Sequence, residues 1–262
     1  MKLIWMSDLH VAEEKDVIGH DTHARLQMAC DYINKYHSDA EICVISGDLV
    51  DRGTKTGYEV VRNHLEGLVI PYMPMVGNHD RRSLFCEMFQ IPTTAKAPFV
   101  QSTRNIGDAR IICLDTLDEG QDSGAFCQAR RDWLKSELLD AADRSVYLFM
   151  HHPPMPLGLP MQDQDRMVYG DAFLDVLVEY SNIRHMFIGH VHRPICGTVR
   201  GIPFATLPAV SYQAPAPWPA WDWKSFSPAP EAPKMAVIAV NGGDAQVHYV
   251  EFCDYENGMV HA

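Results

Sequence analysis

The stretch Ile183-Arg184-His185-Met186-Phe187-Ile188-Gly189-His190-Val191-His192 joins an apolar run directly to a glycine and two histidines. By itself the histidine pair indicates little, because two histidines at this spacing are common in polar loops. Four more runs of Asp, Asn and His follow apolar runs in the same way, and these are Asp8-Leu9-His10, Gly47-Asp48-Leu49-Val50-Asp51, Gly77-Asn78-His79-Asp80 and His151-His152-Pro153-Pro154. The repetition is informative where a single run is not.

The apolar runs predict short buried strands, and amphipathic segments between them predict helices. We expect strands over residues 2–6, 42–45, 71–76, 110–115, 145–150 and 183–188, and helices over residues 22–36, 56–68, 81–89, 128–139 and 171–180. Strands that alternate with helices are typical of βαβ units in an α/β fold. Sites in such sheets form at the carboxyl ends of the strands, so the five polar runs are expected to meet at one edge.

The C-terminal part of the chain changes character. Residues 202–207, 235–240 and 246–252 are predicted to form strands that are joined without helices. The segment of about residues 212–233 is rich in Pro and Ala and contains Trp218, Trp221, Trp223 and Phe226. We retain three interpretations of it: a surface loop packed by its own aromatic side chains, a lid over the site, or a contact in a homo-oligomer.

The length and the net charge of the chain limit the class of protein and the kinds of partner that we expect. The chain has 262 residues, of which 47% are hydrophobic, so it can bury a sizeable core and is not largely disordered. Lys and Arg number 22 and Asp and Glu 34, which gives a formal net charge of 22 − 34 = −12. This charge argues against nucleic-acid polymers and anionic membranes as partners, but not against a small anionic substrate at a metal site.

Hydropathy and cysteine usage favour a cytoplasmic location. No apolar run reaches the roughly 18 residues that a membrane span requires. The N-terminal apolar run, residues 3–6, is too short for the hydrophobic region of a signal peptide. The seven cysteines include no Cys-x-x-Cys pair and are expected to be reduced thiols rather than a disulfide framework.

The polar runs offer a mixed set of oxygen and nitrogen ligands without sulfur. Such a set suits Mn, Fe, Zn or Co. Seven side chains are too many for one ion but suffice for two if one carboxylate bridges them. Two ions roughly 3.5–4 Å apart can clamp a phosphoryl group and generate a hydroxide nucleophile near neutral pH. The seven candidate ligands are Asp8, His10, Asp48, Asn78, His151, His190 and His192.

In order and type, these runs resemble the signature of the calcineurin-like metallophosphoesterases. The resemblance implies a single domain over residues 1–262 with an α/β fold in four layers, two mixed β-sheets flanked by helices. The run Pro153-Pro154-x-Pro156-Leu157-Gly158 is similar more narrowly to bacterial class III cyclic nucleotide phosphodiesterases and glycerophosphodiesterases.

The resemblance also implies that two groups of side chains each hold one divalent or mixed-valence metal ion. The first group is Asp8, His10 and His192. The second group is Asn78, His151 and His190. Asp48 would bridge the two ions.

Three residues are expected to contact substrate: Asn78, His79 and His152. The resemblance gives His79 the catalytic role, in which it orients the phosphate or protonates the leaving oxygen while a metal-bound hydroxide attacks phosphorus in line. Asp51 and Asp80 are expected to hold neighbouring side chains in place, because histidine ligands and tight turns need hydrogen-bond partners.

The implied activity is hydrolysis of a small phosphodiester, either a 3′,5′- or 2′,3′-cyclic nucleotide or a glycerophosphodiester. A broad-specificity phosphomonoesterase on the same fold is one alternative. Residues 47–53 are also similar to the Ser/Thr protein phosphatases, but those usually carry Glu where this chain has Asp80. A regulatory member without turnover would be expected to lack ligands, and all seven are present.

Overall fold

The first of two large β-sheets is centred on β1 (Lys2–Met6), whose side chains are almost all buried. The computed structural model describes residues 1–92 and 98–253. On one side, β1 pairs in parallel with β4 (Ile42–Ile45), and on the other it pairs antiparallel with β12 (Lys234–Asn241). The sheet ends in β5 (Tyr72–Pro74) beyond β4 and in β13 (Asp244–Glu251) beyond β12.

The second sheet has a parallel centre and antiparallel edges. Its central strands, in spatial order, are β11 (Ile202–Thr206), β9 (Ile183–Ile188), β8 (Ser145–Met150) and β7 (Ala109–Cys113). The edges are β10 (Cys196–Val199) and β6 (Ser102–Ile106), each antiparallel to its neighbour. A two-stranded hairpin, β2 (Asp16–Val17) and β3 (His20–Asp21), and a 3₁₀ helix, η1 (Gln162–Asp165), lie outside the sheets.

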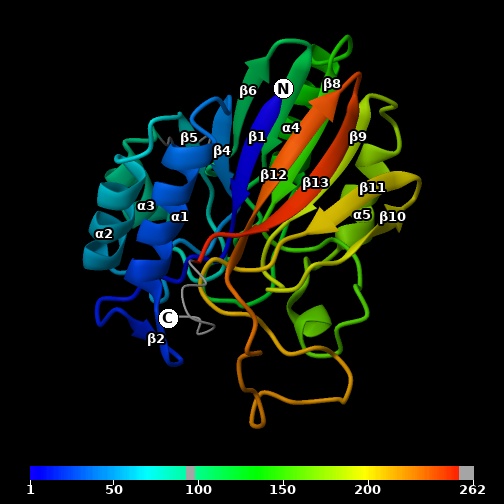
Figure 1. Ribbon diagram of the computed structural model, residues 1–262. Helices are drawn as coiled ribbons and strands as arrows, with labels where there is room; N and C mark the ends of the chain where they lie inside the picture. Colours follow the sequence, from blue (N-terminus) through cyan, green and yellow to red (C-terminus); the bar gives the residue numbers. More distant parts are fainter. Residues whose placement is uncertain (93–97, 254–262) are drawn as a thin grey trace.

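Helices cover the outer face of each sheet, which gives four layers (Figure 1). Apolar side chains of α1 (Thr22–Tyr36), α2 (Lys55–Leu65) and α3 (Arg82–Phe89) pack with the first sheet in one core cluster. Those of α4 (Gln128–Asp140) and α5 (Gly170–Leu177) pack with the second sheet in another. A third core cluster joins the inner faces of the two sheets.

The alternation of side chains along β1 explains how one short strand serves two cores. Leu3 and Trp5 belong to the core between the sheets, whereas Ile4 and Met6 pack toward the helices. The indole of Trp5 lies with its centroid 6.1 Å from that of Phe149 and 5.2 Å from that of Phe187, and its N–H donates to Ser46 Oγ at 2.8 Å. The two sheets are therefore joined by interlocking aromatic rings.

The predicted α/β class and four-layer arrangement are confirmed, with shifts at some element ends. The helix expected to end at residue 68 ends at Leu65, because a turn follows at Glu66 and Gly67. The strand expected over residues 71–76 shrinks to β5 at a sheet edge, in keeping with its two prolines. The edge strand β10 was not predicted, because it is largely exposed and lacks an apolar pattern.

Asp21 caps α1, since its carboxylate accepts from the backbone N–H of Ala24 at 2.9 Å. Within the described part of the chain, no helix combines the length and apolar character needed to cross a bilayer. The expected domain of residues 1–262 includes residues 93–97 and 254–262, which lie outside the described residues.

The imidazole of His185 on β9 makes stability depend on pH. Its ring stacks on Phe187 with centroids 4.5 Å apart, and its Nε2 has no hydrogen-bond partner among the described residues. Burial lowers the pKa of His185 from 6.5 to about 4. Because the unfolded chain takes up this proton first, native stability falls as the pH drops from 6.5 toward 4.

We therefore predict that His185→Leu loses less stability on acidification than the parent protein, by up to about 3 kcal/mol. Urea unfolding of both metal-free proteins at about pH 7.5 and about pH 4.5 measures the difference. Every other titratable group is shared, so an equal loss in the two proteins would contradict the assignment to His185.

Candidate metal centre

Each of the five polar runs begins within a few residues of a strand end, at the carboxyl edge that β1, β4, β5, β8 and β9 share (Figure 1). Backbone hydrogen bonds connect neighbouring runs at this edge. The N–H of Asp8 donates to the carbonyl of Gly47 at 3.1 Å, and the N–H of Gly189 donates to the carbonyl of Met150 at 3.1 Å. The predicted convergence of the runs is therefore present.

Most of the expected ligands sit on strained backbone. Five of them have a positive φ: Asp8 (55°), His10 (43°), Asp48 (49°), His190 (71°) and His192 (50°). Residues other than glycine rarely adopt this region, and they do so where surrounding contacts enforce it. Here one such contact is the bond from the N–H of His10 to the carbonyl of Asp48 at 3.0 Å. The strained turns aim several side chains at one point.

The first group of expected ligands meets at buried atoms. His10 Nε2 and His192 Nε2 lie 3.1 Å apart, and His192 Nε2 lies 3.3 Å from Asp8 Oδ1. The three side chains offer ligand atoms that all lie within 4.8 Å of one another. Two imidazole nitrogens that face each other beside a carboxylate provide a suitable site for a cation.

The second group meets around the side-chain oxygen of Asn78. His151 Nε2 and His190 Nδ1 each lie 3.1 Å from Asn78 Oδ1. The remaining ring nitrogen of His190, Nε2, is buried without a hydrogen-bond partner among the described residues.

Asp48 lies between the two groups. One of its oxygens, Oδ2, is 3.2 Å from His151 Nε2 in the second group and 3.6 Å from His10 Nε2 in the first. The other oxygen, Oδ1, accepts from the backbone N–H of His79 at 2.9 Å. This position fits the expected bridging role.

In His151 and His192, the ring nitrogen Nδ1 lies within hydrogen-bond distance of a backbone carbonyl, and this contact fixes the orientation of the ring. His151 Nδ1 lies 2.9 Å from the carbonyl of Ser46, and His192 Nδ1 lies 2.7 Å from the carbonyl of Tyr212. A ring that donates from Nδ1 directs the Nε2 lone pair into the site, which is the arrangement of metal-ligating histidines.

The electrostatics of the cluster also fit a bound cation. Burial alone would raise the pKa of Asp8, but His192 and His151 outweigh it and hold the pKa at about 2. Burial and the neighbouring His151 lower the pKa of His190 to about 3, so His190 is neutral and able to ligate. Burial disfavours charge on His151, yet Asp48 and Asp8 raise its pKa to about 9. The two carboxylates thus favour positive charge here.

His79 and Asp80 occupy different positions in the same loop. His79 Nδ1 lies 2.7 Å from the carbonyl of Asp51, so its ring is oriented by the turn after β4. Asp80 is buried, and its carboxylate accepts from the hydroxyl of Tyr58 and the N–H of Gly77, both at 2.8 Å. The expected supporting role of Asp80 agrees with these contacts.

The position of His152 argues against the predicted substrate contact. The side chain is fully buried behind His190, with ring centroids 4.7 Å apart. Its Nδ1 lies 2.7 Å from Thr116 Oγ1 and its Nε2 lies 3.2 Å from the carbonyl of Asp122. Both nitrogens are therefore engaged by the loop after β7, and His152 supports that loop rather than facing the cavity.

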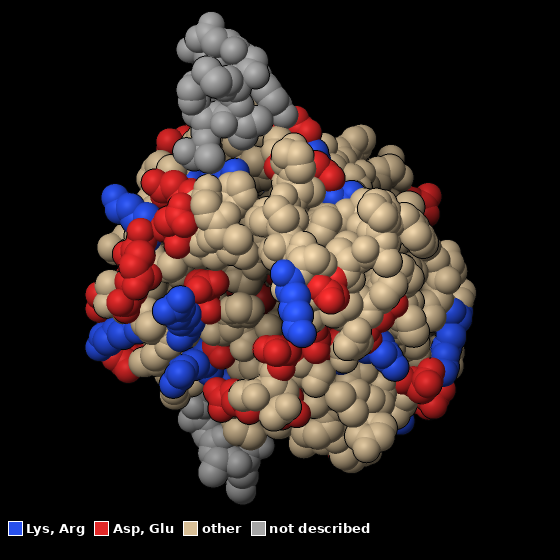
Figure 2. Space-filling view, turned by 90° about the horizontal axis from the view of Figure 1, so that it is seen from below, with Lys and Arg blue, Asp and Glu red and all other residues tan. Residues whose placement is uncertain are grey.

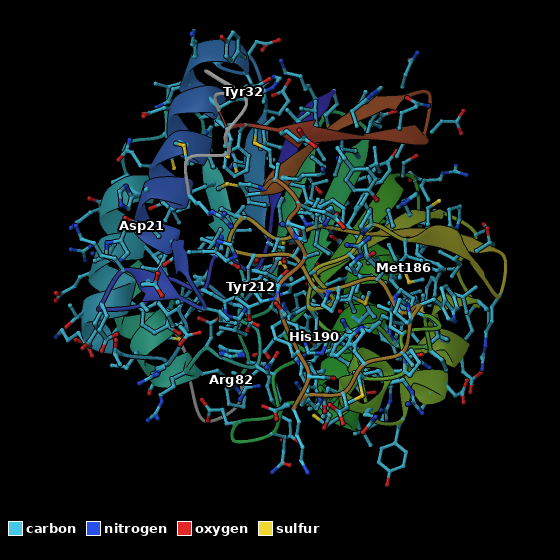
Figure 3. All side chains as sticks on the ribbon, turned by 60° about the horizontal axis from the view of Figure 1, so that its bottom comes forward. Asp21, Tyr32, Arg82, Met186, His190 and Tyr212 are labelled. Carbon is cyan, nitrogen blue, oxygen red and sulfur yellow. The ribbon has the colours of Figure 1, made fainter. Side chains whose placement is uncertain are left out.

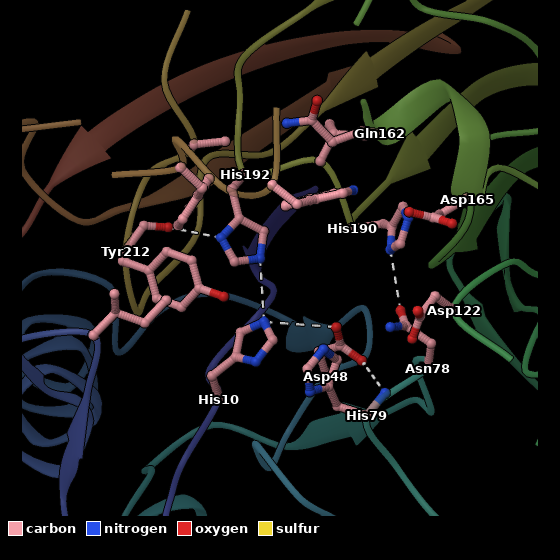
Figure 4. A pocket seen from close by; sticks show the side chains of 15 residues that line it. His10, Asp48, Asn78, His79, Asp122, Gln162, Asp165, His190, His192 and Tyr212 are labelled. Atoms are coloured by element: carbon pink, nitrogen blue, oxygen red, sulfur yellow. Dashed lines mark hydrogen bonds and ion pairs between the residues drawn. The ribbon is translucent and has the colours of Figure 1, made fainter. Parts of the chain in front are cut away.

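A cavity of about 410 Å³ opens above the cluster. Figure 4 shows His10, Asp48 and His79 along its floor, Tyr212 on one side and Asp122 and Asp165 on the other. In Figure 3, Tyr212 and His190 lie near the middle of this face, between the two groups of helices. Seen from the strand ends, acidic and basic side chains both lie around a hollow in this part of the surface (Figure 2).

A second cavity of about 570 Å³ adjoins the first on the other side of His79. Asn78, His79 and Asp122 line both cavities, and Arg52 and Arg81 line only the second. His79 thus stands between two spaces that can receive the two sides of a substrate.

Sequence reasoning anticipated only one wall of the cavity, through the interpretation of the segment 212–233 as a lid over the site. Asp122, Gln162 and Asp165 lie in irregular loops or the short 3₁₀ helix, where no periodicity marks them. Trp223 and Phe226 belong to the aromatic segment 212–233, which was one signal that could have located them.

The buried carboxylates, the inward imidazoles and the four-layer fold together define a metal-dependent phosphoester hydrolase. Residues 1–194 match the family model described as calcineurin-like phosphoesterase, and the chain belongs to this family.

Among curated proteins, the chain is 35% identical over 260 residues to a probable cyclic nucleotide phosphodiesterase of Rhodopseudomonas palustris, covering 96% of this chain and 93% of the relative. It is 30% identical over 222 residues to the glycerophosphodiester phosphodiesterase GpdQ of Enterobacter lignolyticus, covering 82% of this chain and 79% of the relative. Among solved structures, a dimetal phosphatase from Danio rerio has a TM-score of 0.73 at 14% identity, with 92% of this chain and 93% of that chain covered. The structural likeness supports the fold.

The close approach of Gly77 to the cluster yields a test. A Cβ at this position would overlap Asp48 and lie 2.7 Å from His151 Nε2, so a larger residue must displace one of them. We predict that Gly77→Ala binds Mn²⁺ roughly 10- to 100-fold more weakly, as measured by calorimetric titration.

Gly107→Ala is the matched control for this test. Gly107 has a positive φ, of 57°, which Gly77 does not share, and a Cβ there meets no atom within 4 Å. The control carries the backbone strain of an alanine without crowding the site, so its Mn²⁺ affinity should match the parent. Equal affinities in both variants would contradict the proposed crowding.

Proposed function

We propose that this protein is a binuclear metal-dependent phosphodiesterase that hydrolyses a small phosphodiester, either a cyclic nucleotide or a glycerophosphodiester. The observation that carries the proposal is the position of Asp48, which lies 3.2 Å from one group of expected ligands and 3.6 Å from the other. The named activities of the two curated relatives, one of each substrate class, support the choice of diesters.

The residues of the site fit two ions such as Mn, Fe, Zn or Co. The first would be held by Asp8, His10 and His192. The second would be held by Asn78, His151 and His190, and Asp48 would be shared. When bound, such ions supply Lewis-acid activation of the phosphoryl group and lower the pKa of water.

The chain's own residues then position the diester for in-line attack by water. His79 lies beside Asp48 on the floor of the cavity, with its ring centroid 4.6 Å from that of His10, and is the group best placed to protonate the leaving oxygen. Burial opposes its charge, but the Asp48 carboxylate, the Asp51 carbonyl and the carboxylates of Asp51 and Asp80 together outweigh burial and raise the pKa of His79 above its ordinary value. Asn78 lines the cavity beside His79 and can donate from its amide to the phosphate.

The charge of the cavity favours a diester over a monoester. Asp122 and Asp165 line one side, and burial, together with the charge of Asp122, raises the pKa of Asp165. A phosphomonoester carries about two negative charges near neutral pH, whereas a diester carries one. Repulsion from this side therefore disfavours the monoester more strongly.

We predict that the Mn²⁺-loaded protein cleaves bis(p-nitrophenyl) phosphate with a kcat/KM at least about tenfold higher than p-nitrophenyl phosphate. The double variant Asp122→Asn, Asp165→Asn should narrow this ratio, because it removes the repulsion of the dianion. Initial rates at fixed ionic strength measure both effects. Faster cleavage of the monoester by the parent protein would overturn the proposal of a phosphodiesterase.

Replacement of His79 and of Asp48 should have separable effects. We predict that His79→Ala lowers kcat about 10²-fold or more on an alkyl diester, and less on an aryl diester whose leaving group needs no proton. Its metal content should remain near that of the parent, whereas Asp48→Ala should lose both metal and activity. Elemental analysis of the metal content and measurement of the reaction rates distinguish the two effects. A metal-depleted His79→Ala protein would refute the role given to His79.

A further inference from the structure

One side of the 410 Å³ cavity is apolar and aromatic. Tyr212, Trp223 and Phe226 line it, and Ile18 from the turn between β2 and β3 completes its rim. We refer to the three rings as the aromatic wall. Trp223 remains 53% exposed and Ile18 49% exposed, although both are large apolar side chains. Exposed apolar groups at the mouth of a cavity above a reactive cluster are typical of a ligand-binding surface.

The aromatic wall is continuous with the metal centre. The ring centroid of Tyr212 lies 4.7 Å from that of His192, so the wall begins at an expected ligand. Phe226 follows, with its centroid 6.3 Å from Tyr212 and 5.8 Å from Trp223. A group attached to a phosphate at the cluster can therefore reach the wall directly.

The packing of the rings indicates what kind of group they receive. Trp221, Trp223 and Phe226 have centroids 5.3–5.8 Å apart and pack against one another. Rings in mutual contact leave no enclosed space for a quaternary ammonium group, which needs a surrounding cage. They offer instead the faces and edges of a surface, on which a planar aromatic group can stack.

The other side of the cavity complements such a group. Asp122 and Asp165 lie across the cavity from Tyr212 (Figure 4). Carboxylates accept hydrogen bonds from sugar hydroxyls, and Gln162 beside them adds an amide. One cavity thus combines a stacking surface, hydroxyl acceptors and a phosphate-binding floor. These are the three chemical parts of a nucleotide.

We propose that the aromatic wall is a subsite for a nucleobase, so that the diester hydrolysed here is a nucleotide whose ribose faces Asp122 and Asp165. This inference rests on the proposed phosphodiesterase function and chooses between its two substrate classes. A glycerophosphodiester presents no planar group to the wall. The segment 212–233, in this role, forms part of the substrate site rather than an oligomer contact.

The test compares Trp223→Ala with Trp218→Ala. Both tryptophans are exposed on the same segment, but Trp218, at 79% exposure, does not line the cavity. With adenosine 3′,5′-cyclic monophosphate, Trp223→Ala should raise KM roughly tenfold while kcat stays within about twofold, as loss of base stacking requires. Trp223→Phe should restore most of the affinity, and Trp218→Ala should match the parent.

A base-free substrate separates this subsite from a general defect. With ribose 3,5-cyclic phosphate lacking the base, the parent and Trp223→Ala should have the same KM. An equal rise in KM on both substrates would overturn the inference, as would cleavage of a glycerophosphodiester but of no cyclic nucleotide by the parent. Failure of the parent to cleave any phosphodiester would instead refute the proposed function.

A binding measurement tests the wall without turnover. In calorimetric titrations of both EDTA-treated and Mn²⁺-loaded protein, adenosine 5′-monophosphate should bind more tightly than ribose 5-phosphate. Trp223→Ala should remove that preference, and Trp218→Ala should keep it. Equal affinity of the parent for the two ligands would overturn the inference even if no hydrolysis had been found.

Discussion

Two carboxylates, Asp8 and Asp48, are buried where the carboxyl edges of the two sheets meet, and much of the local structure offsets their charge. A buried charge is tolerated only when it is paired, and these two also repel each other. The compensating imidazoles of His151 and His192 come from the second sheet, whereas both carboxylates follow strands of the first. The contact between the sheets is therefore electrostatic at this edge and apolar further in, where Trp5 meets the rings of Phe149 and Phe187. A metal site at this position uses an interface that the fold already requires.

Backbone strain is the local cost of this arrangement. Five expected ligands hold a positive φ, which residues other than glycine adopt at an energetic penalty of about 1–3 kcal/mol each. The penalty is sustained by hydrogen bonds from neighbouring runs. Asp8, for example, donates its backbone N–H to Gly47 and accepts from the N–H of His190 through its side chain at 3.2 Å. Rigid turns of this kind fix the ligands before a metal binds, so little conformational freedom remains to be lost on binding.

The ligand runs and the central strands could be predicted because both depend on local sequence. An apolar run of four to six residues followed by Asp or His predicts both a strand and a polar side chain at the end of that strand, as at Ile42–Ile45 and Asp48. The edge strand β10 could not be predicted in this way, because its residues are largely exposed and show no apolar pattern. Its position is set by its antiparallel pairing with β11. The expected substrate contact of His152 stays a prediction, and its ring faces another side than that of His151 because adjacent residues on a strand end point to opposite sides. Next to His151, which enters the cluster, His152 turns to Thr116 and the loop carrying Asp122. The cavity walls come from loops whose conformations are set by tertiary contacts.

Tyr212 shows why the segment 212–233 belongs with the site. Its backbone carbonyl lies 2.7 Å from His192 Nδ1, so this residue fixes the ring of an expected metal ligand. Its side chain lines the cavity and begins the aromatic wall, and its ring also stacks over His20 of the β2–β3 hairpin at 6.5 Å. One residue thus couples ligand orientation, the shape of the substrate cavity and the position of the rim. The backbone carbonyl of Tyr212 orients His192, whereas its side chain lines the cavity. A substitution of the side chain that leaves the backbone conformation unchanged can therefore alter substrate binding while the metal ligand stays oriented. The segment can therefore vary in its aromatic side chains, and so in the substituent it accepts, without loss of the cluster beneath it.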